Sequence, residues 1–197
     1  ARLVHGAGHA GQVPYTLHAW GVRTVPPAEP GGRLQAGVDA FTATLAAPNL
    51  YGLVQGQANS ITPGKRPLSS MSPTSVSKDG KPVMVIGTPG GSRIITVVAL
   101  CILNVIDYGM NIQEAIDAPR FHQQWLPETT NVETFALSPD TRKILVDMGH
   151  KLGDPQPAGH AAGILVGAPT LGGKPRGNDR FYGANDPRRG TGLSLGY

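Results

Sequence analysis

The longest apolar segment of the chain covers residues 94–103 and is interrupted only by Thr96. It is far too short to cross a bilayer, because a membrane-spanning helix needs about 20 apolar residues. Apolar side chains continue to Tyr108 on nearly every side of a helix, so we expect a helix over residues 93–108 that is buried all round. Gly109 is expected to end it. Such a helix requires other elements around it.

Strand signals lie on both sides of this helix. Residues 73–77 and 82–88 are two strand-like segments separated by Lys78-Asp79-Gly80-Lys81. Asp-Gly is a strong signal for a hairpin turn, so we expect the two strands to pair. Two further strands are expected at residues 162–166 and 180–184.

Two shorter helices carry clear end signals. Asn111 is a good N-cap and Glu114 follows three residues later, as in a capping box, while Pro119 should stop this helix near Ala118. The other helix is expected to begin after Ser138, with Pro139 in its first turn, and to end at Gly149. The order of strands, then helices, then strands predicts an α+β fold with antiparallel sheets.

Composition narrows the classes of function. The chain has 197 residues, which is the length of one domain, and 17 basic against 13 acidic residues give a net charge of +4. The basic residues are scattered and form no run of five, which argues against nucleic-acid binding. One cysteine allows no internal disulfide, and the six histidines form no HExxH pattern. No metal and no cofactor are therefore expected.

Two clusters of small residues are candidate binding sites. The adjacent hydroxyls of Ser69 and Ser70 are able to bind a carboxylate, or they belong to a polar loop before a strand. Gly90 and Gly91 lie between a strand and the start of a helix, where backbone N–H groups and the helix dipole favour a negative oxygen. An oxyanion hole is one interpretation, and a tight strand-to-helix turn is the other.

A third cluster contains His122, within residues 118–127. Imidazole is the commonest general base in enzymes. No nucleophile is identified beside this histidine in the sequence, so we favour a structural role for it.

Together these clusters resemble the small, C-terminal subunit of gamma-glutamyltransferases (gamma-glutamyltranspeptidases). The order and spacing fit from about residue 39 to the end, and the PLSSM and PGGSRII motifs are specific. The matching segments are residues 48–53, 64–74, 90–95, 106–111, 118–122, 124–127, 182–184, 186–188 and 196–197.

The resemblance implies a single domain over residues 1–197, of N-terminal-nucleophile hydrolase type, in a four-layer αββα sandwich. It implies a precursor that cleaves itself, a large N-terminal subunit as partner, and transfer or hydrolysis of gamma-glutamyl amides through an acyl-enzyme. Ser69 and Ser70 match the substrate-carboxylate pair, and Gly90 and Gly91 match the oxyanion hole. Bacterial relatives of this kind are commonly periplasmic or secreted.

The first 38 residues match the family poorly. The nucleophile position holds Ala1, which has no hydroxyl, although Thr16 matches a threonine near the nucleophile. The Asp-Asp-Phe motif, whose second aspartate binds the substrate amine, reads Asp39-Ala40-Phe41 here. Three explanations for this block are open: a relative that has lost or changed the activity, a frame shift within the block, or an engineered exchange of threonine at position 1.

Two other functions are therefore weighed against gamma-glutamyl transfer. A glutaryl-type cephalosporin acylase has a substrate without an α-amine, which suits Ala40. A catalytically inactive binding subunit suits Ala1.

Overall fold

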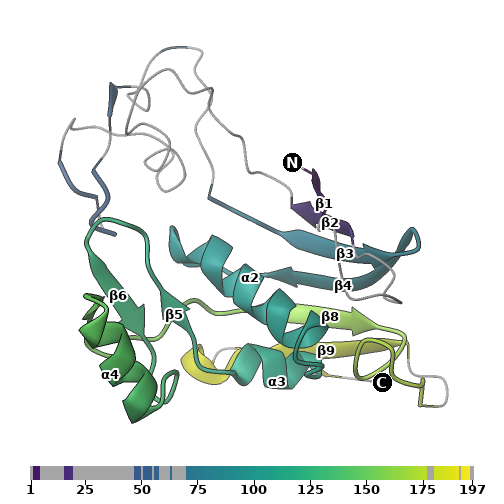
Figure 1. Ribbon diagram of the computed structural model, residues 1–197. Helices are drawn as coiled ribbons and strands as arrows, with labels where there is room; N and C mark the ends of the chain where they lie inside the picture. Colours follow the sequence, from purple (N-terminus) through teal and green to yellow (C-terminus); the bar gives the residue numbers. More distant parts are fainter. Residues whose placement is uncertain are drawn as a thin grey trace.

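The computed structural model describes residues 2–4, 16–19, 47–49, 51–54, 56–57, 63, 70–176, 180–190 and 192–195. Its architecture is mixed α and β (Figure 1). The strands are β1 (Arg2–Val4), β2 (Thr16–Ala19), β3 (Thr74–Lys78), β4 (Lys81–Gly87), β5 (Phe121–His122), β6 (Thr129–Val132), β7 (Lys151–Leu152), β8 (Ala162–Val166) and β9 (Phe181–Asn185). The helices are α2 (Arg93–Ile106), α3 (Ile112–Asp117), α4 (Pro139–Asp147) and the 3-10 helix η2 (Pro187–Arg189).

The larger sheet has six strands in the order β1-β2-β3-β4-β8-β9, and all neighbouring strands are antiparallel. The predicted hairpin is its centre. Asp79 and Gly80 both have positive φ, 51° and 75°, as a tight two-residue turn between twisted strands requires. The strands expected at 162–166 and 180–184 are β8 and β9, the second shifted by one residue.

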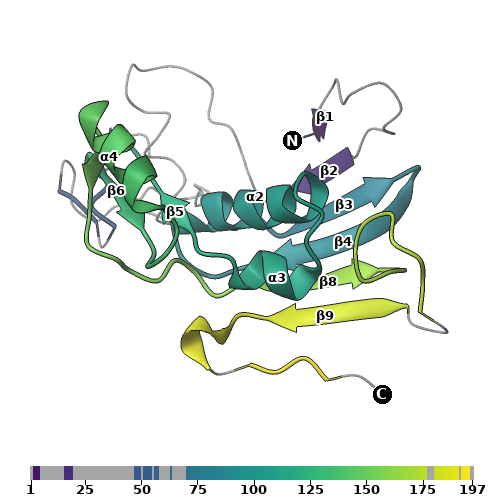
Figure 2. The ribbon, with the colours of Figure 1, turned by 60° about the horizontal axis from the view of Figure 1, so that its bottom comes forward.

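Helices α2 and α3 cover one face of this sheet (Figure 2). The core lies between these helices and the sheet. Its largest buried apolar side chains are Met84, Ile86, Ile116, Leu165, Val76, Val97 and Val105. Cys101 is buried in this core. The expectation that α2 is buried all round is wrong. Its far side leaves Ile95 and Leu103 49% and 45% exposed, and the helix ends at Ile106.

The shorter helices begin as the capping signals predict. Asn111 accepts hydrogen bonds from the N–H groups of Gln113 and Glu114, and the Glu114 carboxylate accepts one from the N–H of Asn111. Ser138 caps α4, with Pro139 in its first turn. None of the described helices is long and apolar enough to span a bilayer.

The smaller sheet has three strands in the order β5-β6-β7 and lies beside the larger one (Figure 1). Strands β6 and β7 run parallel, so the prediction of purely antiparallel sheets is wrong for this pair. Across the described chain the α+β character is confirmed, with one helical layer on one face of the larger sheet.

Candidate active site

Several chain segments leave the larger sheet at the same end. Thr74 at the start of β3 pairs with Ile86 near the end of β4, so Ser70 before β3 and Gly90 after β4 emerge together. Ala162 at the start of β8 pairs with Gly87, and Asn185 at the end of β9 pairs with Ala162. The segments at residues 157–161 and 186–188 therefore reach this end of the sheet as well.

The N-terminal strands follow the same register. Arg2, which begins β1, pairs with His18, and Ala19 at the end of β2 pairs with Thr74. Thr16 pairs with Ser77, three residues farther along β3 and toward its other end. Ala1, Asp39 and Ser69 lie outside the described residues. Ser70 is described and buried, and its carbonyl accepts a hydrogen bond from the Ser72 hydroxyl.

Gly90 and Gly91 form the turn that enters α2. Their φ angles of +147° and +59° fall where side chains are rarely tolerated. A methyl group on Gly91 would overlap the ring of Tyr51 at Cζ, so the tyrosine ring packs directly on the turn. The carbonyls of Gly90 and Gly91 accept from the N–H groups of Arg93 and Ile94, while their own N–H groups have no partner among the described residues.

The segment at residues 157–160 closes the other side of this turn. The Thr88 hydroxyl accepts from the N–H of His160 at 2.9 Å and donates to the Pro89 carbonyl. Arg93 donates to the Pro157 carbonyl at 3.2 Å. A cavity of about 370 Å³ remains beside the turn, and its lining residues are Tyr51, Gly90, Arg93, Pro157, Gly159 and Arg188.

Gln124 connects the turn to its surroundings. Its Oε1 accepts from the Ser92 hydroxyl at 2.6 Å and lies 2.8 Å from Nε2 of His122. Its Nε2 donates to the carbonyls of Tyr51, at 2.6 Å, and Leu126, at 2.8 Å. The two carbonyls accept only, so they fix the orientation of the amide.

These hydrogen bonds determine which ring nitrogen of His122 carries the proton. An amide oxygen cannot donate, so Nε2 of His122 carries the proton and Nδ1 accepts from the Thr96 hydroxyl at 2.9 Å. Burial lowers the pKa of His122, the hydrogen bond to Gln124 opposes this, and the charge of Arg93 adds to the lowering. Both ring nitrogens are engaged, and the histidine joins β5 to α2.

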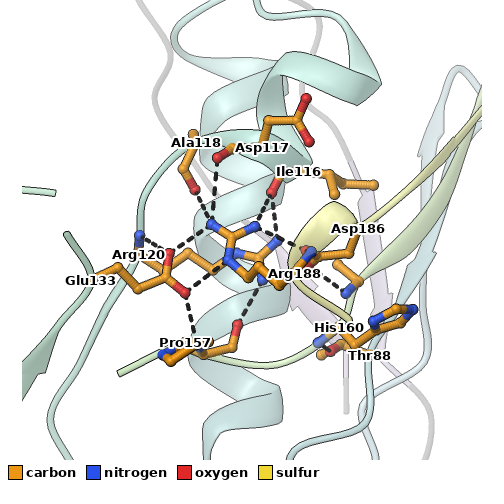
Figure 3. Close-up of polar contacts among 12 residues, drawn as sticks. Thr88, Ile116, Asp117, Ala118, Arg120, Glu133, Pro157, His160, Asp186 and Arg188 are labelled. Atoms are coloured by element: carbon orange, nitrogen blue, oxygen red, sulfur yellow. Dashed lines mark hydrogen bonds and ion pairs between the residues drawn. The ribbon is translucent and has the colours of Figure 1, made fainter. Parts of the chain in front are cut away.

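A buried ionic cluster of Arg120, Glu133, Asp186 and Arg188 supports the segment at residues 157–161 (Figure 3). Nη1 of Arg120 lies 2.8 Å from Oδ2 of Asp186 and donates to the Ala158 carbonyl. Arg188 binds Glu133 through Nε and Nη2, at 2.8 and 2.6 Å. The carboxylates also accept from the backbone: Glu133 from the N–H of Ala158, and Asp186 from that of Ala161.

Both carboxylates of this cluster are ionised against the effect of burial. Burial alone would raise the pKa of Glu133, but the hydrogen bonds from Arg188 and from two backbone N–H groups hold it below its usual value. Burial likewise acts to raise the pKa of Asp186, and the N–H groups of Ala161 and Arg188 with the charge of Arg120 outweigh it.

The sequence interpretation placed Gly90, Gly91 and Ser70 in a site, and the structure brings their segments to one end of the sheet. It gave no role to Gln124 or Glu133, because their partners lie far away in the chain. The only local signal for Gln124 is that it lies within the cluster at residues 118–127 that contains His122, and Glu133 lies outside this cluster. Within the described part of the chain, no cluster of three or more His, Cys, Asp or Glu side chains is placed to hold a metal ion.

The chain is similar in sequence to known proteins. The chain is 64% identical over 195 residues to a glutathione hydrolase proenzyme of Pseudomonas sp. (strain A14), a match that covers 99% of this chain and 34% of the relative. The chain thus spans about a third of that relative's length.

Solved structures give the same result. A mutant gamma-glutamyltranspeptidase of Helicobacter pylori superposes with a TM-score of 0.67 at 48% identity, covering 76% of this chain and 77% of that one. The cephalosporin acylase of Bacillus halodurans superposes with a TM-score of 0.56 at 27% identity, covering 66% and 23%. The family model of gamma-glutamyltranspeptidase matches residues 20–195. The chain therefore belongs to the gamma-glutamyltranspeptidase family.

Proposed function

We propose that this chain is the small subunit of an enzyme that transfers or hydrolyses gamma-glutamyl groups, with glutathione-type amides as substrates. The observation that carries the proposal is the turn at Gly90 and Gly91. It presents backbone N–H groups that have no partner among the described residues, at the start of the 14-residue helix α2. The matching family and the relatives named for this chemistry support it.

The chemistry follows from the geometry of acyl transfer. A nucleophile adds to the gamma-carbonyl, its oxygen becomes negative, and the N–H groups of Gly90 and Gly91 donate to that oxygen. The positive end of α2 contributes in the same direction. Collapse of this intermediate expels the amine, and water or an acceptor amine then releases the glutamyl group. Ser69 and Ser70 are the proposed ligands of the substrate carboxylate, and Asp39 contributes to substrate binding.

The nucleophile is assigned to position 1, because strand β1 begins at the end of the sheet where Ser70 and Gly90 emerge. A supporting role is assigned to Thr16, although it pairs with Val4 and therefore lies toward the other end of β1. Ala1 has no hydroxyl, so attack from this position requires a residue with a nucleophilic side chain there, such as threonine. An α-amine at a chain terminus would then serve as the base.

A large subunit completes the proposed enzyme. The sheet face opposite α2 and α3 exposes Val85, Ile164 and Phe181, and Phe181 is 69% exposed. Val85 pairs directly with Ile164, and Phe181 pairs with Val166, two residues farther along β8, so apolar side chains of three neighbouring strands share this face. Burying it against a second sheet, itself covered by helices, gives the four-layer αββα sandwich. We place the assembled protein in the periplasm or outside the cell, as the resemblance implies.

Two alternatives have specific support. A cephalosporin acylase activity is favoured by Ala40 at the amine-binding position and by the likeness to the acylase of Bacillus halodurans. A role in binding without catalysis is favoured by Ala1.

One comparison of substrates separates the three. The chain is assembled with its large subunit, with residue 1 as the N-terminus, and an Ala1→Thr version is made alongside. Both are given a gamma-glutamyl anilide and a glutaryl cephalosporin. The proposal requires preferential turnover of the anilide by the Ala1→Thr protein. Preference for the cephalosporin supports the acylase instead, and binding without turnover by both versions supports the non-catalytic role.

A further inference from the structure

We propose that Gln124 is a positioning residue that locks the Tyr51 segment and the turn at Gly90 and Gly91 into one unit. The inference rests on the proposed function, because it assigns to Gln124 the task of holding the oxyanion donors in place. Gln124 itself touches no reacting atom in this scheme. It acts through Ser92 and Tyr51.

The amide of Gln124 holds one segment with each of its ends. Its oxygen accepts from the hydroxyl of Ser92, the residue directly after Gly91. Its nitrogen donates to the carbonyl of Tyr51, whose ring packs on Gly91. The separation of Gln124 from Tyr51 is 73 residues and from Ser92 it is 32, so the side chain joins three distant segments.

The segment around Tyr51 is stiff enough to transmit this constraint. The Asn49 side chain accepts from the N–H groups of Tyr51 and Leu53, and the Asn49 carbonyl accepts from that of Gly52. Pro48 and Val54 form a bridge that closes the loop, and Leu53 is buried. The loop therefore moves as one body, and its position depends on what holds it from outside.

The side chain of Gln124 is itself held in place by further hydrogen bonds. Its nitrogen donates to the Leu126 carbonyl and its oxygen accepts from the protonated Nε2 of His122, which is bound through Nδ1 to Thr96 on α2. The chain of contacts thus starts and ends on α2, the helix that the turn enters. A displaced Tyr51 ring would free Gly91 from the contact that now restricts it. The N–H groups of the turn would then no longer point at the position of the oxyanion.

Three substitutions test the two halves of the amide. Gln124→Glu keeps the acceptor for Ser92 and His122 but loses the donor to Tyr51 and replaces it with a repelling oxygen. Gln124→Ala loses both halves. Ser92→Ala removes only the contact to the turn. Gln123→Ala is the matched control, because this neighbouring glutamine is exposed and its side chain accepts only from the N–H of Trp125 among the described residues.

Hydrogen exchange of the assembled protein, followed by mass spectrometry, reads both segments. The amides of Gly52 and Leu53 report the Tyr51 loop, and those of Arg93 and Ile94 report the turn. We expect Gln124→Ala to speed exchange in both segments by about 10-fold, as the loss of one or two hydrogen bonds implies. Gln124→Glu should affect mainly the loop, Ser92→Ala mainly the turn, and Gln123→Ala neither.

A kinetic readout distinguishes positioning from a purely structural role. In the Ala1→Thr assembly, Gln124→Ala should lower kcat for the gamma-glutamyl anilide by about 10- to 100-fold and leave KM within about 2-fold, because misplaced donors weaken the transition state rather than the bound substrate. Unchanged exchange in both segments, or an equal effect of Gln123→Ala, overturns the proposal. If Gln124→Ala unfolds the protein, Gln124→Glu and Ser92→Ala decide by the same criteria.

The two proposals fail in different ways. If the Ala1→Thr assembly does not turn over the anilide, the proposed function fails, and the exchange pattern still decides whether Gln124 joins the loop to the turn. If turnover is present and Gln124→Ala leaves kcat unchanged, the positioning role fails and the proposed function stands.

Discussion

Arg120 and Asp186 form an ion pair that is almost completely removed from water, with side chains 1% and 0% exposed and 2.8 Å between Nη1 and Oδ2. Arg120 lies shortly after the end of α3, and Asp186 directly follows β9. The pair therefore joins the ends of these two elements. Buried charges are costly unless their hydrogen-bonding capacity is used. Here Arg120 also donates to the carbonyls of Ile116 and Ala158, which offsets part of the cost, while its buried Nε has no hydrogen-bond partner among the described residues.

Removing one member of this pair should be strongly destabilising. Asp186→Ala leaves the charge of Arg120 buried without its partner, and we expect a loss of about 3–5 kcal/mol in the free energy of unfolding. Asp147→Ala, which breaks the exposed pair with Lys143, should cost less than about 0.5 kcal/mol. Urea denaturation measures both. Equal losses for the two variants would contradict the energetic role assigned to burial.

The ionic cluster should make stability depend on pH in the acid range. The pKa values of Glu133 and Asp186 are lowered in the folded state, so the unfolded state binds more protons as the pH falls. Their stabilisation is complete above the unfolded pKa values of about 4 and is lost as the pH falls through the folded ones. Glu133→Gln should lower stability at pH 7 and flatten this loss.

Unfolding free energies across the range from neutral to acid pH test this sign. Glu128→Gln is the control, because Glu128 also has a lowered pKa but forms an exposed pair with Lys151. It should change the pH dependence much less. A pH profile that is unaffected by Glu133→Gln would contradict the assignment.

His122 should titrate below the usual histidine range. Burial lowers its pKa, and its Nε2 proton is already committed to Gln124. Nuclear magnetic resonance of the ring nitrogens should show the neutral Nε2–H form at neutral pH. Gln124→Glu places a carboxylate beside the ring and should raise this pKa. A charged imidazole at neutral pH in the wild type would refute the hydrogen-bond pattern.

The turn at Gly91 should reject even one methyl group. Gly91→Ala combines a positive φ with a clash against Tyr51, so we expect it to destabilise by more than about 2 kcal/mol and to displace the ring. Gly109→Ala has a similar φ of +66° but open space around the added methyl, and should cost only about 1 kcal/mol. Thermal unfolding compares the two, and a similar cost would show that the Tyr51 contact is unimportant.

The exposed face of the larger sheet should determine assembly with the proposed large subunit. Ile164→Asp places a charge in the apolar surface shared with Val85 and should weaken association without altering the core, because Ile164 points away from α2 and α3. Phe135→Asp is a control, because this side chain is equally apolar and 91% exposed, but follows β6 of the smaller sheet. Co-purification and sedimentation measure the difference. Equal association of both variants would exclude this face.

The sequence was sufficient for features that depend on neighbouring residues. The hairpin at Asp79 and Gly80 and the capping box of Asn111 and Glu114 are local hydrogen-bond patterns, and both are present as predicted. The turn at Gly90 and Gly91 was also located, because glycine spacing between a strand and a helix is local.

Features that depend on distant contacts could not be predicted in the same way. The partner of Glu133 is Arg188, 55 residues later, and the partner of Gln124 is Tyr51, 73 residues earlier. For helix α2 the sequence predicted too much burial. Its apolar composition predicts burial on all sides, yet Ile95 and Leu103 face outward in this chain.

The most direct test of the account is the mass of the small chain during turnover. The Ala1→Thr chain, assembled with its large subunit, is mixed with a gamma-glutamyl anilide, quenched in acid and mapped by peptide mass spectrometry. The account predicts a mass increase of one glutamyl group on the peptide that contains residue 1, and a smaller yield of it in Gly91→Ala. Release of the anilide with no such adduct, or an adduct elsewhere on the chain, would contradict it.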